Sequence, residues 1–494
     1  MVRKWSPVRI RAWAPRTESW RPLDRAPEAY TRPVLLRQVD LGGFKAFQEA
    51  SIGTAPITVL IGPNNGGKST VLQAVALLAQ TVSSNSQGRV KTDGPLVDLG
   101  EDAARLANDS LGQRGPWSIG LTWHGSLNPV DQVPEIGFQL QAVQNRPQGF
   151  TTSAWVRQSL PPGRLVQASV VWGTGEPQKL RVTAPDLRTT NERLPPIERT
   201  VDINAFEPWR WQIMSQIARH NQSAILSGDP DAVVAEILLA ATPYFSAGIA
   251  EQLRTFRYVG ADRQVVRSAY PLGQGSTNPQ SAEEVISSLA RSDDILFQVS
   301  ERLRKTFEYG LDKTLPSRQS FPRPVVQSEQ VGLVGIGEGN RRRLLVNMGA
   351  GFAQFAWVAL QLELARIVPI PFENESPLPT PIVGVEEPEL HLHPRLQPAM
   401  ARLLAQFALE NGQVICSTQS EHFLLAILEL VLEKTLKPEH VAIYYLDAPH
   451  GIVDRLDVDN NGQLKGGLKG FFEENERQIE RQIDLLRKSA NLGS

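Results

Sequence analysis

The stretch that decides the fold reads "IGPNNGGKST" at residues 61–70, directly after the apolar run "ITVL". Gly62, Gly67, Lys68 and Ser69 stand at the spacing G-x-x-x-x-G-K-[ST]. Glycines in such a loop allow backbone N–H groups to wrap around phosphates, and the start of a following helix adds a favourable field. The pattern therefore predicts a loop that cradles the phosphates of a nucleotide.

The flanking residues support this interpretation. "PITVLIG" before the loop is typical of a strand, and "KSTVLQAVALLAQ" after it has apolar residues at helical spacing. A chance glycine-rich turn is the alternative, which the order strand, loop, helix disfavours. We expect ATP and Mg²⁺ as cofactors, with Lys68 on the β- and γ-phosphates and the Ser69 hydroxyl on Mg²⁺. The candidate nucleotide-binding residues of the loop are Gly62, Asn64, Asn65, Gly66, Gly67, Lys68, Ser69 and Thr70.

Two acids follow a second apolar strand, in "IVGVEEPE" at 382–389. In open α/β sheets, ligands bind at the carboxyl edge of the strands. We expect Glu386 to hold Mg²⁺, directly or through water, and Glu387 to orient and polarise the attacking water. The alternative is an ordinary pair of solvated carboxylates.

Two further segments carry candidate residues. In "NMGAGFAQ", Gly349 and Gly351 precede a long apolar helix, which indicates either a second phosphate-binding helix start or an ordinary glycine turn. In "CSTQSEHF", Gln419 follows a strand and is a candidate to bind a γ-phosphate or the water. Ser420 is a candidate N-cap of the next helix, and both roles are compatible.

Composition excludes several classes of protein. The 494 residues are enough for about two to four domains, and the formal net charge of −1 excludes a uniformly basic nucleic-acid coat. One cysteine, Cys416, excludes a disulfide framework and a cysteine-based zinc site. No apolar run approaches the roughly 20 residues of a membrane span, and no signal peptide is evident. We therefore expect a cytoplasmic protein without a membrane partner.

The chain is predicted to be an α/β protein, with a P-loop NTPase core whose mixed sheet is covered by helices. Residues 34–100 and 331–446 are expected to form the two parts of this core. Residues 101–330 are expected to form an inserted lid of antiparallel strands and helices. Residues 1–33, rich in basic residues, Pro and Trp, are expected to form an arm, and residues 447–494 a helical tail.

Four local features leave alternatives open. The N-terminal arm either packs on the body or contacts nucleic acid. The triplet 341–343 is either a contact to nucleic-acid phosphates or a row of solvated arginines. Arg263 either braces the nucleotide site or forms a buried ion pair. "HLH" at 391–393 suggests a metal ligand pair, but no matching ligand set accompanies it, so packing after the acidic strand is favoured.

Together, these motifs resemble a known family. "LLRQVDLGGFKAF…ITVLIGPNNGGKST", "VGVEEPELHLHP", "GAGFAQ" and "STQSEHF" resemble the Walker A, Walker B, signature and switch segments of ABC-type ATPase heads of the SMC, RecF and OLD kind. "GPLVDLG", "FRYVGADR" and the tail "HVAIYYLD…GFFEE" resemble a bacterial subgroup of AAA-type ATPases linked to antiphage defence. The resemblance spans about residues 34–475.

The resemblance implies a mode of action. Such heads form head-to-tail homodimers that sandwich ATP, which would place Gly349 and Gly351 opposite Lys68 and Glu387 of a second copy. It also implies antiphage defence or DNA maintenance, with DNA and a nuclease or other effector protein as partners.

The sequence departs from the family in its switch segment, where Gln419 replaces a histidine. Glutamine can form hydrogen bonds but cannot carry a proton at neutral pH, so slow hydrolysis is expected. A scaffold that binds ATP with little turnover is the runner-up, and a P-loop kinase is the third possibility.

Overall fold

The computed structural model describes most of the chain from residue 35 to residue 465. The described ranges are 35–83, 90–111, 115–124, 135–142, 150–160, 164–173, 176–183, 188–189, 192–193, 197–201, 250–261, 270–271, 282–289, 292–307, 309–314, 330–338, 341–366 and 380–465. Among the predicted features, the arm at 1–33, Arg263 and residues 466–494 of the predicted helical tail lie outside these ranges. The described start of that tail, 447–465, contains a strand at Ile452–Leu456, so the prediction of a tail that is helical from residue 447 is wrong.

A six-stranded sheet forms the centre of the core, in the order β12-β17-β18-β3-β19-β20. All neighbouring strands pair in parallel except β19 and β20. The strands are β3 (Ile57–Ile61), β12 (Arg257–Val259), β17 (Ile382–Glu386), β18 (Gln413–Ser417), β19 (Val441–Asp447) and β20 (Ile452–Leu456). This sheet confirms the predicted P-loop type of α/β fold.

The register of the parallel strands brings the predicted site segments to one edge. β18 lies between β17 and β3, with Glu386 opposite Ser417 and Ser417 opposite Leu60. The glycine loop, the acidic segment and the switch segment all follow these aligned ends. Segments separated by more than 300 residues in sequence therefore meet at the carboxyl edge, where ligands bind in open α/β sheets.

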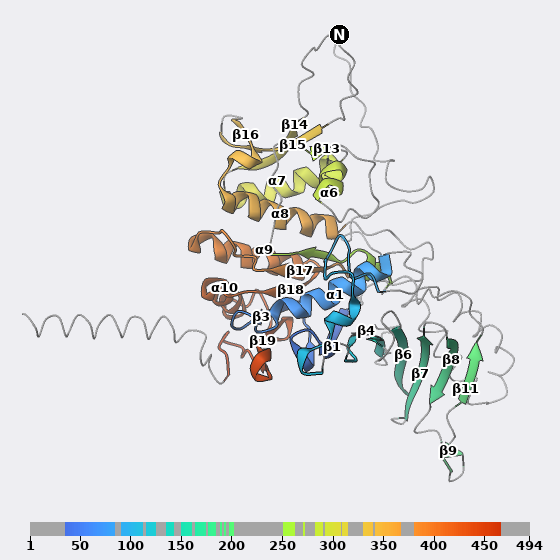
Figure 1. Cartoon of the computed structure of the whole chain (residues 1–494). Helices are drawn as coiled ribbons and strands as arrows, with labels where there is room; N and C mark the ends of the chain where they lie inside the picture. The colour runs from blue at the N-terminus through green and yellow to red at the C-terminus, as the bar shows by residue number, and fades with distance from the viewer. Residues whose placement is uncertain are drawn as a thin grey trace, which may run out of the picture.

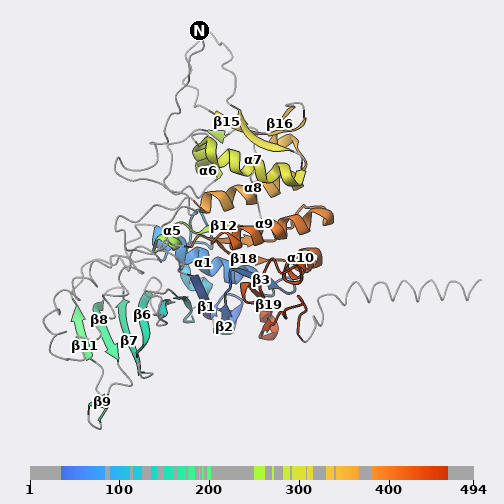
Figure 2. The ribbon, with the colours of Figure 1, turned by 180° about the vertical axis from the view of Figure 1, so that it is seen from behind.

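Helices cover both faces of this sheet (Figures 1 and 2). α1 (Lys68–Ser83) covers one face, and α8 (Ala350–Ala365) and α9 (Gln397–Leu409) cover the other. α10 (Glu421–Leu432) packs against α9, and α7 (Asp293–Phe307) packs against α8. Short helices α5 (Ala250–Arg254) and α6 (Ala282–Leu289) complete the described α-helices.

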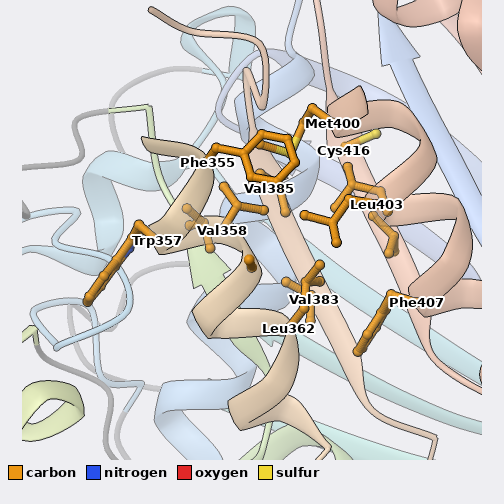
Figure 3. Packing of buried hydrophobic residues seen from close by; sticks show 14 of the residues in the cluster. Phe355, Trp357, Val358, Leu362, Val383, Val385, Met400, Leu403, Phe407 and Cys416 are labelled. Carbon is orange, nitrogen blue, oxygen red and sulfur yellow. The ribbon is translucent and has the colours of Figure 1, made fainter. Parts of the chain in front are cut away.

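Alternate residues of the central strands enter two different hydrophobic cores. Leu60 and Ile415 belong to the core around α1, whereas Val59 and Cys416 belong to the core around α8 and α9. Figure 3 shows the second core, in which side chains of α8 and α9 meet those of β17 and β18. Because both faces of the sheet are buried, the sequences of these strands are nearly continuous runs of apolar residues.

A second, eight-stranded sheet is antiparallel and runs in the order β11-β8-β7-β6-β5-β4-β1-β2. Its strands are β1 (Leu35–Phe44), β2 (Phe47–Gly53), β4 (Ser118–His124), β5 (Glu135–Ala142), β6 (Phe150–Leu160), β7 (Arg164–Gly173), β8 (Glu176–Thr183) and β11 (Ile197–Val201). The antiparallel strands predicted after residue 100 are present. They continue a sheet that begins with β1 and β2, so this sheet crosses the expected boundary at residue 100.

The strand that precedes the glycine loop, β3, does not pair with β1, because the two strands lie in different sheets. β1 turns back at Lys45, whose φ of 48° lies in the left-handed region, and pairs with β2. β3 pairs instead with β18 and β19 in the parallel sheet. Two-residue hairpins favour such left-handed positions because their twist matches that of the strands.

Smaller elements complete the described structure. A further sheet joins β15 to β13, β14 and β16, and β9 pairs with β10. These strands are β9 (Arg188–Thr189), β10 (Glu192–Arg193), β13 (Tyr270–Pro271), β14 (Gly310–Thr314), β15 (Gln330–Ile336) and β16 (Arg342–Leu344). In the part of the chain that is described, no helix is both long and apolar enough to cross a membrane.

Gln413, the first residue of β18, ties the two large sheets together. Its side chain is fully buried, its Oε1 accepts a bond from Leu36 N at 3.1 Å, and its Nε2 donates to Leu36 O at 2.7 Å. Nε2 also lies 3.2 Å from Ala55 O. One amide thus satisfies backbone groups on β1 and on the segment that leads into β3.

We predict that Gln413→Leu lowers the free energy of unfolding by about 2 kcal/mol, because the buried N–H of Leu36 loses its acceptor, whereas Leu36 O keeps its bond from the Thr54 hydroxyl. Gln406→Leu is the matched control, since Gln406 bonds only to Glu410 at the surface of α9 among the described contacts. Thermal and urea unfolding measure both variants. Equal loss in both would contradict the role of Gln413.

Candidate functional site

The glycine loop is closed against the end of β19. A Cβ atom on Gly62 would lie 2.0 Å from Leu446 O, and one on Gly66 would lie 2.4 Å from the same atom. Gly62 also has φ of 141°, a conformation that residues with side chains rarely adopt. A cradle that admits only glycine next to the start of a helix fits the phosphates of a nucleotide.

Lys68 lies across this loop. Its Nζ donates to Gly62 O and Pro63 O, both at 2.8 Å, and the residue is 7% exposed. Burial lowers the pKa of Lys68, and the carboxylates of three glutamates, Glu387, Glu389 and Glu386, oppose that shift. The ammonium is therefore held at the loop with acidic groups around it. Ser69 is half-buried and Thr70 is buried at the start of α1, while Asn64 and Asn65 are exposed.

Glu386 ends β17 in a nearly buried position, 7% exposed. The Tyr258 hydroxyl of β12 donates to Glu386 Oε1 at 2.7 Å. Burial and the neighbouring carboxylate raise the pKa of Tyr258, so that its hydroxyl keeps the proton that it donates. Mg²⁺ takes oxygen ligands, usually one or two from protein side chains and the rest from water and phosphate. Glu386 together with Ser69 fits that requirement.

The first residue after β17, Glu387, adopts an uncommon backbone conformation with φ of 42°. Its N–H donates to Ser417 O at 2.8 Å, which fixes it to the end of β18. The Gln419 Nε2 donates to Glu387 Oε1 and to Asn64 Oδ1, both at 2.8 Å. One side-chain amide thus connects the acidic segment, the glycine loop and the switch segment.

Glu389 is 9% exposed and is a further residue of this site that was not among the candidates from the sequence. Its Oε1 accepts bonds from the Thr418 hydroxyl at 2.7 Å and from Gln419 N at 2.9 Å. Burial raises the pKa of Glu389, and these two hydrogen bonds oppose the shift. Tyr258 was also missed. Glu389 ends the acidic segment 382–389, but its burial against Thr418 and Gln419 is not visible in the sequence. Tyr258 lies outside every motif, and the pairing of β12 with β17 brings it to the site.

Gly349 and Gly351 lie at the start of α8. A Cβ on Gly351 would lie 3.1 Å from His391 O, so this turn packs against the loop that follows the acids. No hydrogen bond among the described residues joins either glycine to residues 62–70. The structure therefore gathers the glycine loop, both acids and Gln419 into one site, and places the two glycines elsewhere on the chain.

Other predicted features have local roles. The Ser420 hydroxyl accepts from Phe423 N at 3.0 Å and caps α10, as expected. His393 Nδ1 accepts from Arg395 N at 3.3 Å and caps a short helix. Within the described ranges, no group of three or more His, Cys, Asp or Glu residues is arranged to hold a metal ion. In the triplet 341–343, Arg342 pairs with Asp312 at 2.7 Å.

Three family models match this chain. Residues 247–424 match an AAA ATPase domain, and residues 57–122 match an AAA domain described as a putative AbiEii toxin of a type IV TA system. Residues 436–482 match a family described as a protein of unknown function, DUF3696.

Curated relatives match in a shorter segment. A DNA replication and repair protein RecF from Gloeobacter violaceus is 40% identical over 75 residues, which is 15% of this chain and 19% of the relative. RecF from Acaryochloris marina is 36% identical over 88 residues, or 18% of this chain and 22% of the relative. The chain thus spans about a fifth of the length of these relatives. Two segments of this chain are therefore similar to AAA-type ATPase domains, and a short segment is similar to RecF.

Solved SMC structures are similar to this chain at low identity. An SMC head bound to the C-terminal winged-helix domain of ScpA is 12% identical with a TM-score of 0.42, covering 86% of this chain and 98% of that one. The SMC head from Thermotoga maritima is 12% identical with a TM-score of 0.34, covering 86% and 99%.

We predict that Gly66→Ala weakens ATP binding by at least about tenfold, because the added Cβ would displace Leu446 O or reshape the cradle. Gly260→Ala is the control, since its Cβ would meet Tyr258 only at an ordinary contact distance of 3.6 Å. Equilibrium binding of ATP to both variants measures the effect. Unchanged affinity in Gly66→Ala would show that this loop does not bind the phosphates.

We also predict that Tyr258→Phe raises the Mg²⁺ concentration needed for half-maximal ATP turnover by about tenfold, because groups that orient a metal ligand typically contribute that much. Tyr445→Phe on β19 is the control for loss of a tyrosine hydroxyl. A Mg²⁺ requirement that is the same in both variants would argue against a role of Tyr258 in orienting Glu386.

Proposed function

We propose that this protein binds and slowly hydrolyses ATP with Mg²⁺ and acts as a switch between two states of a head-to-tail homodimer. One observation carries the hydrolytic part. Gln419 Nε2 lies 2.8 Å from both Glu387 Oε1 and Asn64 Oδ1 and so links the acid that would activate water to the loop that would hold the phosphates.

Each residue has a distinct task in this proposal. ATP would supply the phosphoanhydride bond that is hydrolysed. Ser69 and Glu386 are the residues that would hold Mg²⁺. Lys68 leaves Gly62 O and Pro63 O and uses its ammonium to neutralise phosphate charge. Glu387 orients the attacking water and accepts its proton.

In this proposal, Gln419 limits the rate of ATP hydrolysis. Its amide fixes the carboxylate of Glu387 but cannot take up a proton at neutral pH. It also bonds to Glu387 and Asn64 at the same time, so the direction of the water-activating carboxylate depends on the position of this amide. Slow turnover, or turnover stimulated by a partner, follows from the lack of a proton carrier in the switch segment.

A dimer would complete the site. Gly349 caps the start of α8, and a Cβ there would meet nothing within 4 Å, so this helix start is open. A helix N-terminus favours an anion, and a second copy would present it to the phosphates held by Lys68. The proposal therefore predicts a composite site with residues from two chains.

The wider role is supported by the comparisons. The RecF relatives support a role in DNA maintenance, and the resemblance of the sequence motifs to AAA-type ATPases linked to antiphage defence is the basis for the other role. In either setting, DNA and a nuclease or other effector protein are the expected partners. The scaffold with little turnover is the second candidate, and Gln419 in the switch segment is the observation that favours it.

We predict that ATP turnover per chain rises with protein concentration and that Glu387→Gln and Lys68→Ala abolish it. A composite site needs two chains, so the specific activity should follow the fraction of dimer. Turnover is measured as phosphate release over a wide range of protein concentrations, and the oligomeric state is measured in parallel with and without ATP.

Three other outcomes are informative. Turnover that is independent of concentration would exclude the head-to-tail site, and phosphate transfer to a cosubstrate would indicate the kinase. Tight ATP binding without turnover would favour the scaffold, and Gln419→His would then test whether the switch residue is the cause.

A further inference from the structure

Glu389 is a buried acid whose contacts lie on the switch segment. It is 9% exposed, and its Oε1 accepts from the Thr418 hydroxyl at 2.7 Å and from Gln419 N at 2.9 Å. Its Oε2 is buried and has no hydrogen-bond partner among the described residues. An apolar side chain would be less costly at a purely structural position of this kind, because a buried carboxyl with an unmet oxygen is unfavourable.

The backbone around Glu389 is fixed at both ends. Glu387 N donates to Ser417 O at 2.8 Å, and Leu390 N donates to Glu387 O at 2.9 Å. Leu392 N donates to Glu389 O at 2.9 Å. These bonds fix the turn that carries the Glu389 carboxyl, next to Thr418 and Gln419, which follow β18.

The bond to Gln419 N acts on the residue whose side chain reaches across the site. The Gln419 backbone is held by Glu389 on one side, and Ser420 N donates to the Thr418 hydroxyl at 3.0 Å on the other. From this fixed backbone, the Gln419 amide reaches Glu387 and Asn64. Glu389 itself makes no hydrogen bond to the glycine loop among the described contacts. Apart from the charge that it presents to Lys68, it is connected to that loop through Gln419.

We propose that Glu389 is a positioning residue that fixes the backbone of Gln419, so that the Gln419 amide lies between the water-activating acid and the glycine loop. The proposal rests on the hydrolytic function proposed above and deepens it. Loss of Glu389 leaves the cradle for the phosphates in place, and it lets the Gln419 side chain sample positions away from Glu387. Its expected effect is therefore on the turnover number rather than on the affinity for ATP.

The test compares Glu389→Ala, Glu389→Gln, Gln419→Ala and the double variant Glu389→Ala/Gln419→Ala. Glu363→Ala is the control for losing a buried acid, because Glu363 is 8% exposed and pairs with Arg302 on α7, away from the switch segment. Phosphate release gives the turnover number, and equilibrium binding gives the ATP affinity. Hydrogen exchange of the peptide that contains the Gln419 amide reports the position of the backbone directly.

Glu389→Ala is expected to lower turnover by about tenfold and to change ATP affinity by less than about threefold. Glu389→Gln keeps an acceptor oxygen and is expected to recover most of the activity. The double variant is expected to be no slower than Gln419→Ala, since residues that act as a unit have non-additive effects. The Gln419 amide is expected to exchange faster in Glu389→Ala than in the wild type or in Glu363→Ala.

Two results would overturn the proposal. One is a fall in ATP affinity as large as the fall in turnover, and the other is a double variant whose loss is the product of the two single losses. If the wild type shows no turnover at any concentration, the hydrolytic function fails first. Hydrogen exchange then decides on Glu389 alone, because an unchanged Gln419 amide in Glu389→Ala would refute the positioning role without any activity measurement.

Discussion

Parallel pairing of β18 with both β17 and β3 is the constraint on which the site depends. The register places Glu386, Ser417 and Leu60 opposite one another. The three segments that follow these strands therefore begin side by side at the carboxyl edge of the sheet. Glu387 N bonds to Ser417 O and Thr418 N bonds to Leu60 O, which extends the alignment by one residue beyond the strands. The distances between Gln419, Glu387 and Asn64 follow from this arrangement.

The surrounding structure supports the strands that end at this edge. Apolar side chains bury both faces of the central strands, and burial of this kind is the dominant favourable contribution to folding. On one face, α8 is anchored at its end by Glu363, which binds Arg302 of α7 at 2.6 Å. On the other face, Gln413 joins the parallel sheet to the antiparallel sheet through backbone groups of β1. Against this framework, Glu387 can keep a left-handed backbone conformation that would be unfavourable in a mobile loop.

Much of the core could be predicted from the sequence. The apolar runs before "GPNNGG" and "EEPE" predict buried strands, and β3 and β17 confirm them. The N-cap role of Ser420 also follows from local chemistry and is confirmed. The partners of β1 and β3 could not be predicted, because an apolar pattern does not specify which strand is the neighbour. Glu389 and Tyr258 were missed for a related reason, since the partner of Tyr258 lies on another strand and that of Glu389 lies in the segment after β18.

The sequence by itself determined the chemistry of this protein: a glycine loop with a lysine and a serine, two acids at the end of a strand, and a glutamine in the switch segment. These depend on local spacing, because backbone conformation and helix starts are set by residues a few positions apart. Only the tertiary structure decided which of these groups meet. It brought Gln419 to Glu387 and Asn64 and buried Glu389 beneath Gln419. It also packed the turn at Gly351 against His391 O. These neighbours could not be predicted, because strand order and register are set by long-range packing that no local pattern encodes.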